Sequence, residues 1–178
     1  MFREVALRGI CMGRLYLHSM PGRYEPFERT VEEVQRLRIG RVVRLTPLEE
    51  LREKSPAYFA AIREGRLPWV DEGEDVRDYG VPEHREAFLE KARSVADSLR
   101  QGERVLVHCG AGVGRTGMFA ICVLMALGLS MGEAERRVRE AGSEPETKGQ
   151  REFVEWAKGR LRAARRTEAG ETQGEGCS

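Results

Sequence analysis

The sequence places a cysteine and an arginine at the two ends of a short glycine-rich segment. Cys109 is followed by Gly-Ala-Gly-Val-Gly and then by Arg115 and Thr116. Glycines allow successive backbone N–H groups to turn toward one point and bind an anion, and a helix that begins there adds its partial positive charge. The same field favours the thiolate form of a cysteine. A planar guanidinium can bind two oxygens of one phosphoryl group.

This segment therefore predicts nucleophilic attack by Cys109 on a phosphoryl group. The candidate phosphate ligands are the segment's backbone amides and the arginine side chain: Gly110, Ala111, Gly112, Val113, Gly114 and Arg115. Thr116 can donate a hydrogen bond to the sulfur when the thiophosphate is hydrolysed. His108 is expected to bond to the backbone and hold the loop, because a thiolate stabilised by the loop needs no base.

The elements that must position this segment alternate between strands and helices. Residues 104–108 form a short apolar strand before the loop, and residues 118–128 form a helix that is apolar nearly all round. Strands are also expected at 14–19 and 41–46, with an extended piece at 67–70 followed by an acidic, glycine-rich loop. Helices are expected at 28–37, 47–54, 56–64, 82–99, 130–141 and 147–166, with Thr46, Ser55, Ser130 and Thr147 as N-caps. We predict a single α/β domain with a mostly parallel sheet covered by helices on both faces.

Composition excludes several classes of protein. The chain has 178 residues, enough for one compact domain, which we place at 1–166 with a disordered tail at 167–178. A net charge of +1 argues against a dedicated nucleic-acid or membrane surface. The longest apolar run, at 118–129, is shorter than the roughly 20 residues that span a bilayer, and no signal peptide is expected, so we predict a cytoplasmic protein. The cysteines, at 11, 109, 122 and 177, form neither a zinc motif nor a disulfide framework.

The segment resembles the signature of the cysteine-dependent protein tyrosine phosphatases, His-Cys-x5-Arg-(Ser/Thr), which residues 108–116 match in full. The chain is similar to the small dual-specificity branch over roughly residues 9–162. The spacing of LHSMPG, of the two-helix insert and of DYGVPEH is most similar to the cyclin-dependent kinase-associated phosphatase type. The resemblance implies a cysteinyl-phosphate intermediate and an upstream aspartate as general acid. No metal or other cofactor is expected, because Arg115 and the backbone amides supply the positive field that metal phosphatases take from ions.

The general acid must come from a cluster of aspartates. Three of the four aspartates in the chain, Asp71, Asp75 and Asp78, lie within eight residues. A general acid has to reach the leaving-group oxygen from a neighbouring loop. Asp78 stands just before a proline-initiated helix and matches the family's acid loop, so we predict that it is the acid. Asp75 is the alternative, and a third interpretation is that all three only solvate a loop.

Several further side chains allow two interpretations. Gln150 matches the family residue that positions the hydrolytic water, with Glu146 beside it, but it also completes a capping box with Thr147. Cys122 is expected to pack in the core, with a redox role for it or for Cys11 as the lesser alternative. We expect His18 and His84 at the surface and the two tryptophans, Trp69 and Trp156, in the core.

The uncharged loop favours one substrate class. Loops specific for polyanions carry extra Lys or Arg between the cysteine and the arginine, whereas residues 110–114 carry none. We therefore predict a phosphoprotein or phosphopeptide as substrate. The alternative substrates are a phosphoinositide and an RNA 5′-triphosphate, and the alternative reaction is a rhodanese-like sulfur transfer. A catalytically dead phosphate-binding module would ordinarily lack Cys109, Arg115 or the acid, and none of these is missing.

Overall fold

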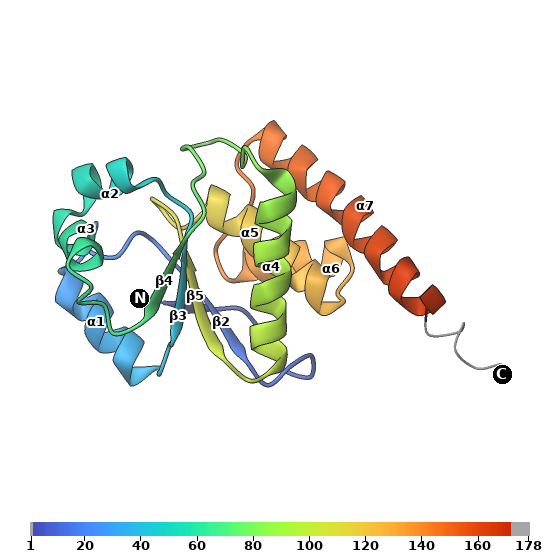
Figure 1. Ribbon diagram of the computed structural model, residues 1–178, viewed down its shortest axis with the longest axis horizontal. Helices are drawn as coiled ribbons and strands as arrows, with labels where there is room; N and C mark the ends of the chain where they lie inside the picture. Colours follow the sequence, from blue (N-terminus) through green and yellow to red (C-terminus); the bar gives the residue numbers. More distant parts are fainter. Residues whose placement is uncertain (1, 172–178) are drawn as a thin grey trace.

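The computed structural model describes residues 2–171, with side chains through residue 164. Its five strands form one sheet in the order β1-β2-β5-β3-β4 (Figure 1). The strands are β1 (Arg3–Glu4), β2 (Arg14–His18), β3 (Arg41–Arg44), β4 (Val70–Gly73) and β5 (Arg104–His108). Only β1 runs antiparallel to its neighbour, and β2, β5, β3 and β4 are parallel. The predicted, mostly parallel sheet is therefore confirmed.

The register of the parallel strands brings their carboxyl ends to one edge. His18 at the end of β2 and Arg44 at the end of β3 both pair with His108, the last residue of β5. Gly73 at the end of β4 pairs with Arg44 in turn. Loops that leave these ends share the crevice where open α/β sheets bind ligands.

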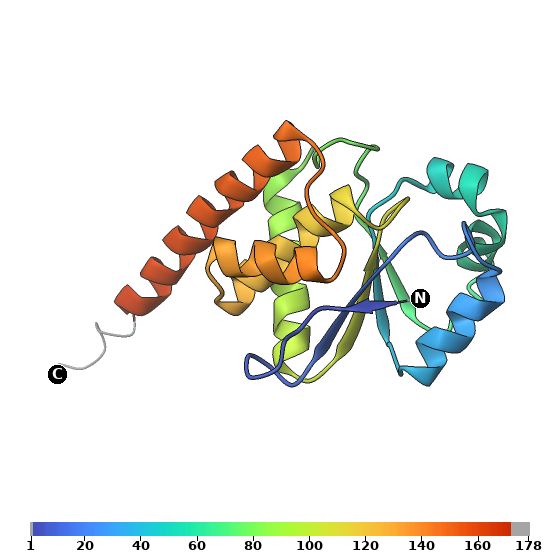
Figure 2. The ribbon, with the colours of Figure 1, turned by 180° about the vertical axis from the view of Figure 1, so that it is seen from behind.

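Helices cover both faces of the sheet, as predicted (Figures 1 and 2). One layer contains α1 (Phe27–Arg36), α2 (Leu48–Lys54) and α3 (Pro56–Arg63), and the other contains α4 (Arg85–Arg100), α5 (Gly114–Leu127), α6 (Met131–Glu140) and α7 (Lys148–Glu171). Alternate strand residues point to opposite faces, so Leu106 of β5 joins the core on the side of α1–α3, whereas Val105 and Val107 join the core on the side of α4–α7.

Helix α5 is the central element of its layer. Its residues from Gly114 to Met125 are all buried, which agrees with its apolar sequence. Phe119 of α5 meets Phe88 of α4 edge to face at 5.0 Å between ring centroids, and Phe88 meets Phe153 of α7 at 5.3 Å. These contacts fix the position of the helix whose first turn follows the glycine-rich loop.

The structure departs from the predicted elements at β4. The extended segment is residues 70–73, so Asp71 and Glu72 belong to a strand where we expected a loop. An edge strand needs no apolar alternation when its polar side chains find partners, and both carboxylates are ion-paired, Asp71 with Arg44 and Glu72 with Arg41. The short strand β1 was not predicted.

Helix boundaries differ by a few residues, and two predicted caps are wrong. Helix α4 begins at Arg85 rather than Pro82, and α7 continues to Glu171 rather than ending near Arg166, while the predicted tail beyond it, 172–178, lies outside the described residues. Neither Thr46 nor Ser55 makes an N-cap bond. The Ser55 hydroxyl donates to the carbonyl of Pro21 instead. Ser130 caps α6 as predicted, by accepting from the amide of Glu133. No helix among residues 2–171 is long and apolar enough to cross a membrane.

Two helical glycines provide a matched test of the packing around α5. A Cβ added at Gly117 would lie 2.6 Å from backbone atoms of Glu144, whereas one added at Gly132 of α6 would meet nothing within 4 Å. We expect Gly117→Ala to lower the free energy of unfolding by about 1–3 kcal/mol because backbone must move. Gly132→Ala should raise it by about 0.5–1 kcal/mol through helix propensity. Urea denaturation measures both, and equal effects would contradict the close approach.

Candidate active site

The glycine-rich loop connects the end of β5 to the start of α5, and it curls around the sulfur of Cys109. The backbone N–H of Gly112 donates to Cys109 Sγ over 3.2 Å. Gly112 has a φ of +78°, and a Cβ there would lie 2.4 Å from the carbonyl oxygen of His18. Only glycine fits this position, because both the backbone conformation and the space exclude a side chain. The loop thus presents a backbone donor to the sulfur, as the sequence predicted.

Groups outside the loop hold its carbonyls. Ser143 Oγ donates to the Gly112 carbonyl over 2.7 Å, and the guanidinium of Arg3 donates to the same carbonyl and to that of Gly142. The amide of Met20 donates to the Gly110 carbonyl over 3.2 Å. Burial lowers the pKa of Arg3, and attraction to Cys109 offsets part of that effect. Sequence reasoning missed Arg3 and Ser143, because both come from distant segments without a motif.

Arg115 is buried and held by a carboxylate that we did not predict. Its guanidinium donates to both oxygens of Glu50, on α2, over 2.7 and 3.0 Å, and to the carbonyl of Val76 over 2.9 Å. Burial alone would lower the pKa of Arg115, but the hydrogen bonds that it donates to Glu50 and the charges of Cys109, Glu50 and Asp78 raise it overall. For Glu50, burial raises the pKa, yet the bonds from Arg115 and Lys54 leave it below its ordinary value. The pair therefore stays ionised.

The structure separates the three candidate aspartates. Asp78 accepts a hydrogen bond from Arg115 Nη2 over 2.8 Å, and its side chain is 52% exposed. Asp71 and Asp75 instead face Arg44, at 3.2 and 3.3 Å. Of the three, only Asp78 therefore contacts the predicted phosphate ligands.

His108 is enclosed beneath the loop. Its Nε2 lies 3.2 Å from the hydroxyl of Tyr58, and its Nδ1 lies 3.4 Å from the carbonyl oxygen of Cys109. Tyr58 in turn donates to Asp71, which also accepts from Arg44. Burial lowers the pKa of His108 to about 3, so the imidazole is neutral at physiological pH. The contact with the Cys109 carbonyl agrees with a loop-holding role.

Gln150 links the loop that carries Asp78 to the start of α7. Its amide Nε2 donates to the Gly80 carbonyl over 3.1 Å, and its Oε1 accepts from the amide of Glu146 over 2.9 Å. Its own backbone N–H donates to Thr147 Oγ1 over 3.2 Å, which is the predicted cap. Thr147 also donates to the carbonyl of Tyr79 over 3.3 Å. Thr147 therefore caps the helix, whereas the Gln150 side chain bonds to the Glu146 amide in place of the Thr147 amide of a complete capping box, and it also restrains the loop that carries Asp78.

The predicted hydroxyl after Arg115, the two other described cysteines and the tryptophans occupy buried or half-buried positions. Thr116 Oγ1 is buried without a hydrogen-bond partner in this structure, so its predicted bond to the sulfur is not formed here. Cys122 is fully buried in α5, where burial raises its pKa to about 12, and Cys11 is half-buried. Trp69 lies in the core on the side of α1–α3, and Trp156 packs against the core on the side of α4–α7.

The expected surface location of His18 is wrong. Its side chain is buried, and its Nε2 lies 2.6 Å from Glu25 Oε1, within hydrogen-bond distance. Phe2 lies against its ring at 4.6 Å between centroids, and burial lowers the pKa of the imidazole. His18 is the last residue of β2 and pairs with His108 of β5. Phe2 and Glu25 cover its side chain, and the sequence around His18 does not indicate these contacts. His84 is exposed, as predicted.

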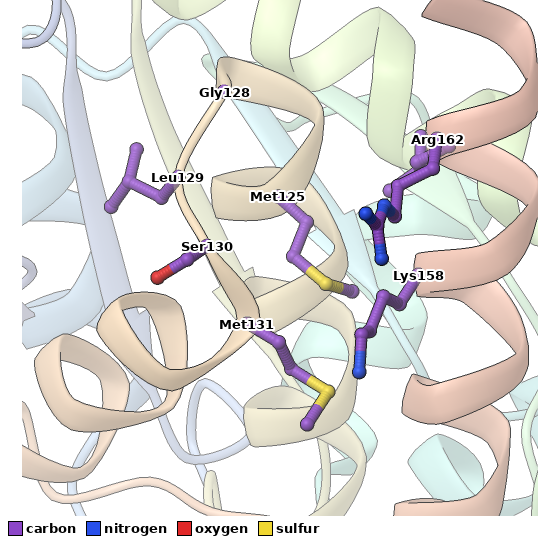
Figure 3. Close-up of a pocket in the computed structure, with 8 residues that line it drawn as sticks. Met125, Gly128, Leu129, Ser130, Met131, Lys158 and Arg162 are labelled. Atoms are coloured by element: carbon purple, nitrogen blue, oxygen red, sulfur yellow. The ribbon is translucent and has the colours of Figure 1, made fainter.

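A cavity lies away from this loop, between the end of α5, the start of α6 and α7 (Figure 3). It has a volume of about 420 Å³, and Met125 and Met131 face Lys158 and Arg162 across it. It contains none of the predicted site residues.

Among residues 2–171 no cluster of His, Cys, Asp and Glu is arranged to hold a metal ion.

The parallel sheet and the cysteine–arginine loop at its edge define the architecture of cysteine-dependent phosphatases. Residues 7–173 match the family model PTP-SAK, described as a Swiss Army Knife protein, DSP-PTPase phosphatase domain. The chain therefore belongs to this dual-specificity phosphatase family. It is 34% identical over 104 residues to a putative tyrosine phosphatase, 067L, of Invertebrate iridescent virus 3, covering 56% of this chain. The match spans 41% of that viral protein's length.

Solved structures agree with the fold. A mutant form of Tk-PTP is 29% identical, with a TM-score of 0.66, and the match covers 84% of this chain and 91% of the other. Kinase-associated phosphatase, with its catalytic-site cysteine replaced by serine, has a TM-score of 0.78 at 18% identity, over 92% of this chain and 96% of the other. The latter likeness concerns the fold, and it agrees with the architecture expected from the two-helix insert.

The burial of His108 makes stability depend on pH. Its pKa is about 3 in the folded protein, below the value of about 6.5 in an unfolded chain. Between these values the unfolded chain binds a proton that the folded chain does not, so the free energy of unfolding falls as pH falls. Relative to His108→Gln, wild type should lose up to about 1.4 kcal/mol per pH unit between pH 6 and 4. Chemical denaturation over this range measures the slope, and His84→Gln, which changes an exposed imidazole, should follow wild type.

Proposed function

We propose that this protein hydrolyses phosphomonoesters through a cysteinyl-phosphate intermediate. The observation that carries the proposal is the meeting of three groups at one loop. The Gly112 amide donates to Cys109 Sγ, Arg115 lies at the start of α5, and Asp78 reaches Arg115 from the loop after β4. A nucleophile, a phosphate-binding guanidinium and a carboxyl group for proton transfer are the parts that this reaction needs.

The proposed reaction has two steps. In the first, the Cys109 thiolate attacks phosphorus, the bond from phosphorus to the ester oxygen breaks, and protonated Asp78 gives its proton to that oxygen. In the second, water attacks phosphocysteine, Asp78 takes a proton from the water, and inorganic phosphate leaves as the thiolate returns. Arg115 and the amides of residues 110–114 stabilise the charge on the equatorial oxygens in both steps. We assign Thr116 to stabilising the leaving sulfur in the second step.

The proposed role of Gln150 follows from its contacts. Its amide bonds to the Gly80 carbonyl and the Glu146 amide, so it restrains the acid loop. For it to position the hydrolytic water as well, one of these bonds would have to open. We assign His108 a positioning role as well, because its imidazole is neutral, enclosed and in contact with the Cys109 carbonyl.

We propose a phosphoprotein or phosphopeptide as the substrate. The support is the absence of Lys and Arg from residues 110–114, which leaves the loop matched to one phosphoryl group. No metal is required in this scheme, because the amides and Arg115 supply the positive field that metal phosphatases take from ions.

Replacement of the proposed nucleophile is the direct test. We expect Cys109→Ser to reduce turnover of p-nitrophenyl phosphate to below about 1% of wild type, because a serine hydroxyl stays protonated beside the amides. Phosphate should still bind, since Arg115 and the loop remain. Cys11→Ser, at a half-buried thiol away from the loop, should retain activity. Steady-state phosphate release and phosphate binding by calorimetry measure the two properties, and substantial turnover by Cys109→Ser would identify another nucleophile.

The assignment of the general acid has its own test. Asp78→Asn should lower turnover by about 10²–10⁴ for esters with poor leaving groups, and by much less for an ester whose leaving group departs as a stable anion. Asp75→Asn changes an exposed carboxylate and should preserve the wild-type dependence on leaving-group pKa. Asp71→Asn should instead lower the free energy of unfolding, because the Asp71 carboxylate is buried between Tyr58 and Arg44. A leaving-group dependence altered in Asp75→Asn but not in Asp78→Asn would reverse the assignment.

A further inference from the structure

A second arginine lies beside the catalytic loop, and no carboxylate of the described residues pairs with it. Arg23 follows β2 on the loop whose Met20 amide holds the Gly110 carbonyl. The position that a Cβ would take at Gly110 lies 2.7 Å from Glu50 Oε1, 2.8 Å from Arg115 Nη2 and 3.0 Å from Arg23 Nη1. The two guanidinium groups therefore approach the same point on the loop, with the Glu50 carboxylate beside them.

The charges at this point leave Arg23 uncompensated. Arg115 pairs with Glu50 and Asp78, and Lys54 pairs with Glu50 over 3.0 Å and lies 3.8 Å from Asp78. Two cations thus share two carboxylates. Within the described part of the chain, Arg23 makes no ion pair, and its guanidinium lies over the ring of Tyr24 at 4.7 Å from the centroid. Stacking on an aromatic ring orients the guanidinium without using its hydrogen-bond donors.

We propose that Arg23 binds a second anionic group of the substrate, next to the phosphoryl group held by Arg115. This inference rests on the proposed function and specifies its substrate class: a phosphopeptide with an acidic or phosphorylated residue close to the phosphorylated residue. The loop itself is matched to one phosphoryl group, and the additional cation comes from the segment after β2. An incoming anion meets Arg23 with its donors still available.

Two exposed tyrosines favour a peptide over a lipid headgroup. Tyr24 is 65% exposed and adjoins Arg23, and Tyr79 is 64% exposed and adjoins Asp78. The loops that carry them both reach the Arg115 site, one through Asp78 and the other through Arg23. Exposed aromatic rings beside a charged site suit an extended chain, whose side chains can pack on them.

The test compares substrates that differ only in the flanking charge. A phosphotyrosine peptide with neutral neighbours is compared with the same peptide carrying a glutamate, and then a phosphoserine, next to the phosphotyrosine. We expect wild type to hydrolyse the anionic peptides with a kcat/KM about five- to tenfold higher, which is the size of one charge-assisted hydrogen bond at a partly exposed site. The preference should decrease as salt is raised.

Variants assign that preference to Arg23. In Arg23→Gln the ratio between anionic and neutral peptides should fall to about one, whereas Arg23→Lys should keep part of it because the charge remains. Arg29→Gln, at an exposed arginine of α1, is the matched control and should keep the wild-type ratio. A wild-type protein without the preference, or an Arg23→Gln variant that retains it, would overturn the proposal. So would a preference confined to vesicles containing a phosphoinositide.

The two proposals can fail separately. p-Nitrophenyl phosphate has no second anionic group, so its hydrolysis by wild type tests the proposed function alone. If wild type hydrolyses it and shows no preference among the peptides, only the assignment of Arg23 is wrong. If wild type hydrolyses neither this ester nor any peptide, the proposed function is wrong.

Discussion

The direction of the peptide groups in residues 110–114 is the constraint on which the site depends. An amide can point at the sulfur only if neighbouring carbonyls point away from it, and each buried carbonyl then needs a donor. Ser143 and Arg3 supply donors to the Gly112 carbonyl, and the Met20 amide supplies one to the Gly110 carbonyl. These donors come from three separate segments of the chain. The order of the strands, with β5 beside β2 and β1 next to β2, brings Arg3 and Met20 to the loop, whereas Ser143 comes from the connection between α6 and α7.

The second organising feature is a compact group of charges above that loop. The side chains of Arg115 and Lys54 neutralise the carboxylates of Glu50 and Asp78. In the proposed reaction, a phosphoryl group competes with these carboxylates for the Arg115 guanidinium, so part of its binding energy is used to displace them. The same proposal has this displacement free the Asp78 carboxyl group from Arg115 when the leaving oxygen needs a proton. The Asp78 side chain is 52% exposed and lies on a loop, whereas the Glu50 side chain is 12% exposed and lies on α2.

Local sequence patterns predicted the layers, most helices and the loop that carries Cys109 and Arg115, because each of these is encoded within a few consecutive residues. The contacts that depend on distant segments could not be predicted in this way. Glu50 lies in an ordinary amphipathic helix, and nothing in its neighbourhood indicates an arginine at position 115. Asp71 was grouped with Asp78 by proximity in the chain, yet β4 turns it toward Arg44. His18 was expected at the surface, but Glu25 and Phe2 cover it, and these contacts form only in the folded chain.

Helix α5 contains a second cysteine, Cys122, within the part of the helix that is fully buried. Cys122 is fully buried among apolar side chains, and its pKa of about 12 keeps the thiol protonated at physiological pH. Electrophiles and peroxides react with thiolates, so the interior of this helix is chemically silent toward them. An alkylating probe is therefore expected to spare Cys122, whose thiol is protonated at physiological pH and has no contact with solvent. The chain can carry a cysteine within its core without diverting an oxidant or a covalent inhibitor from the loop.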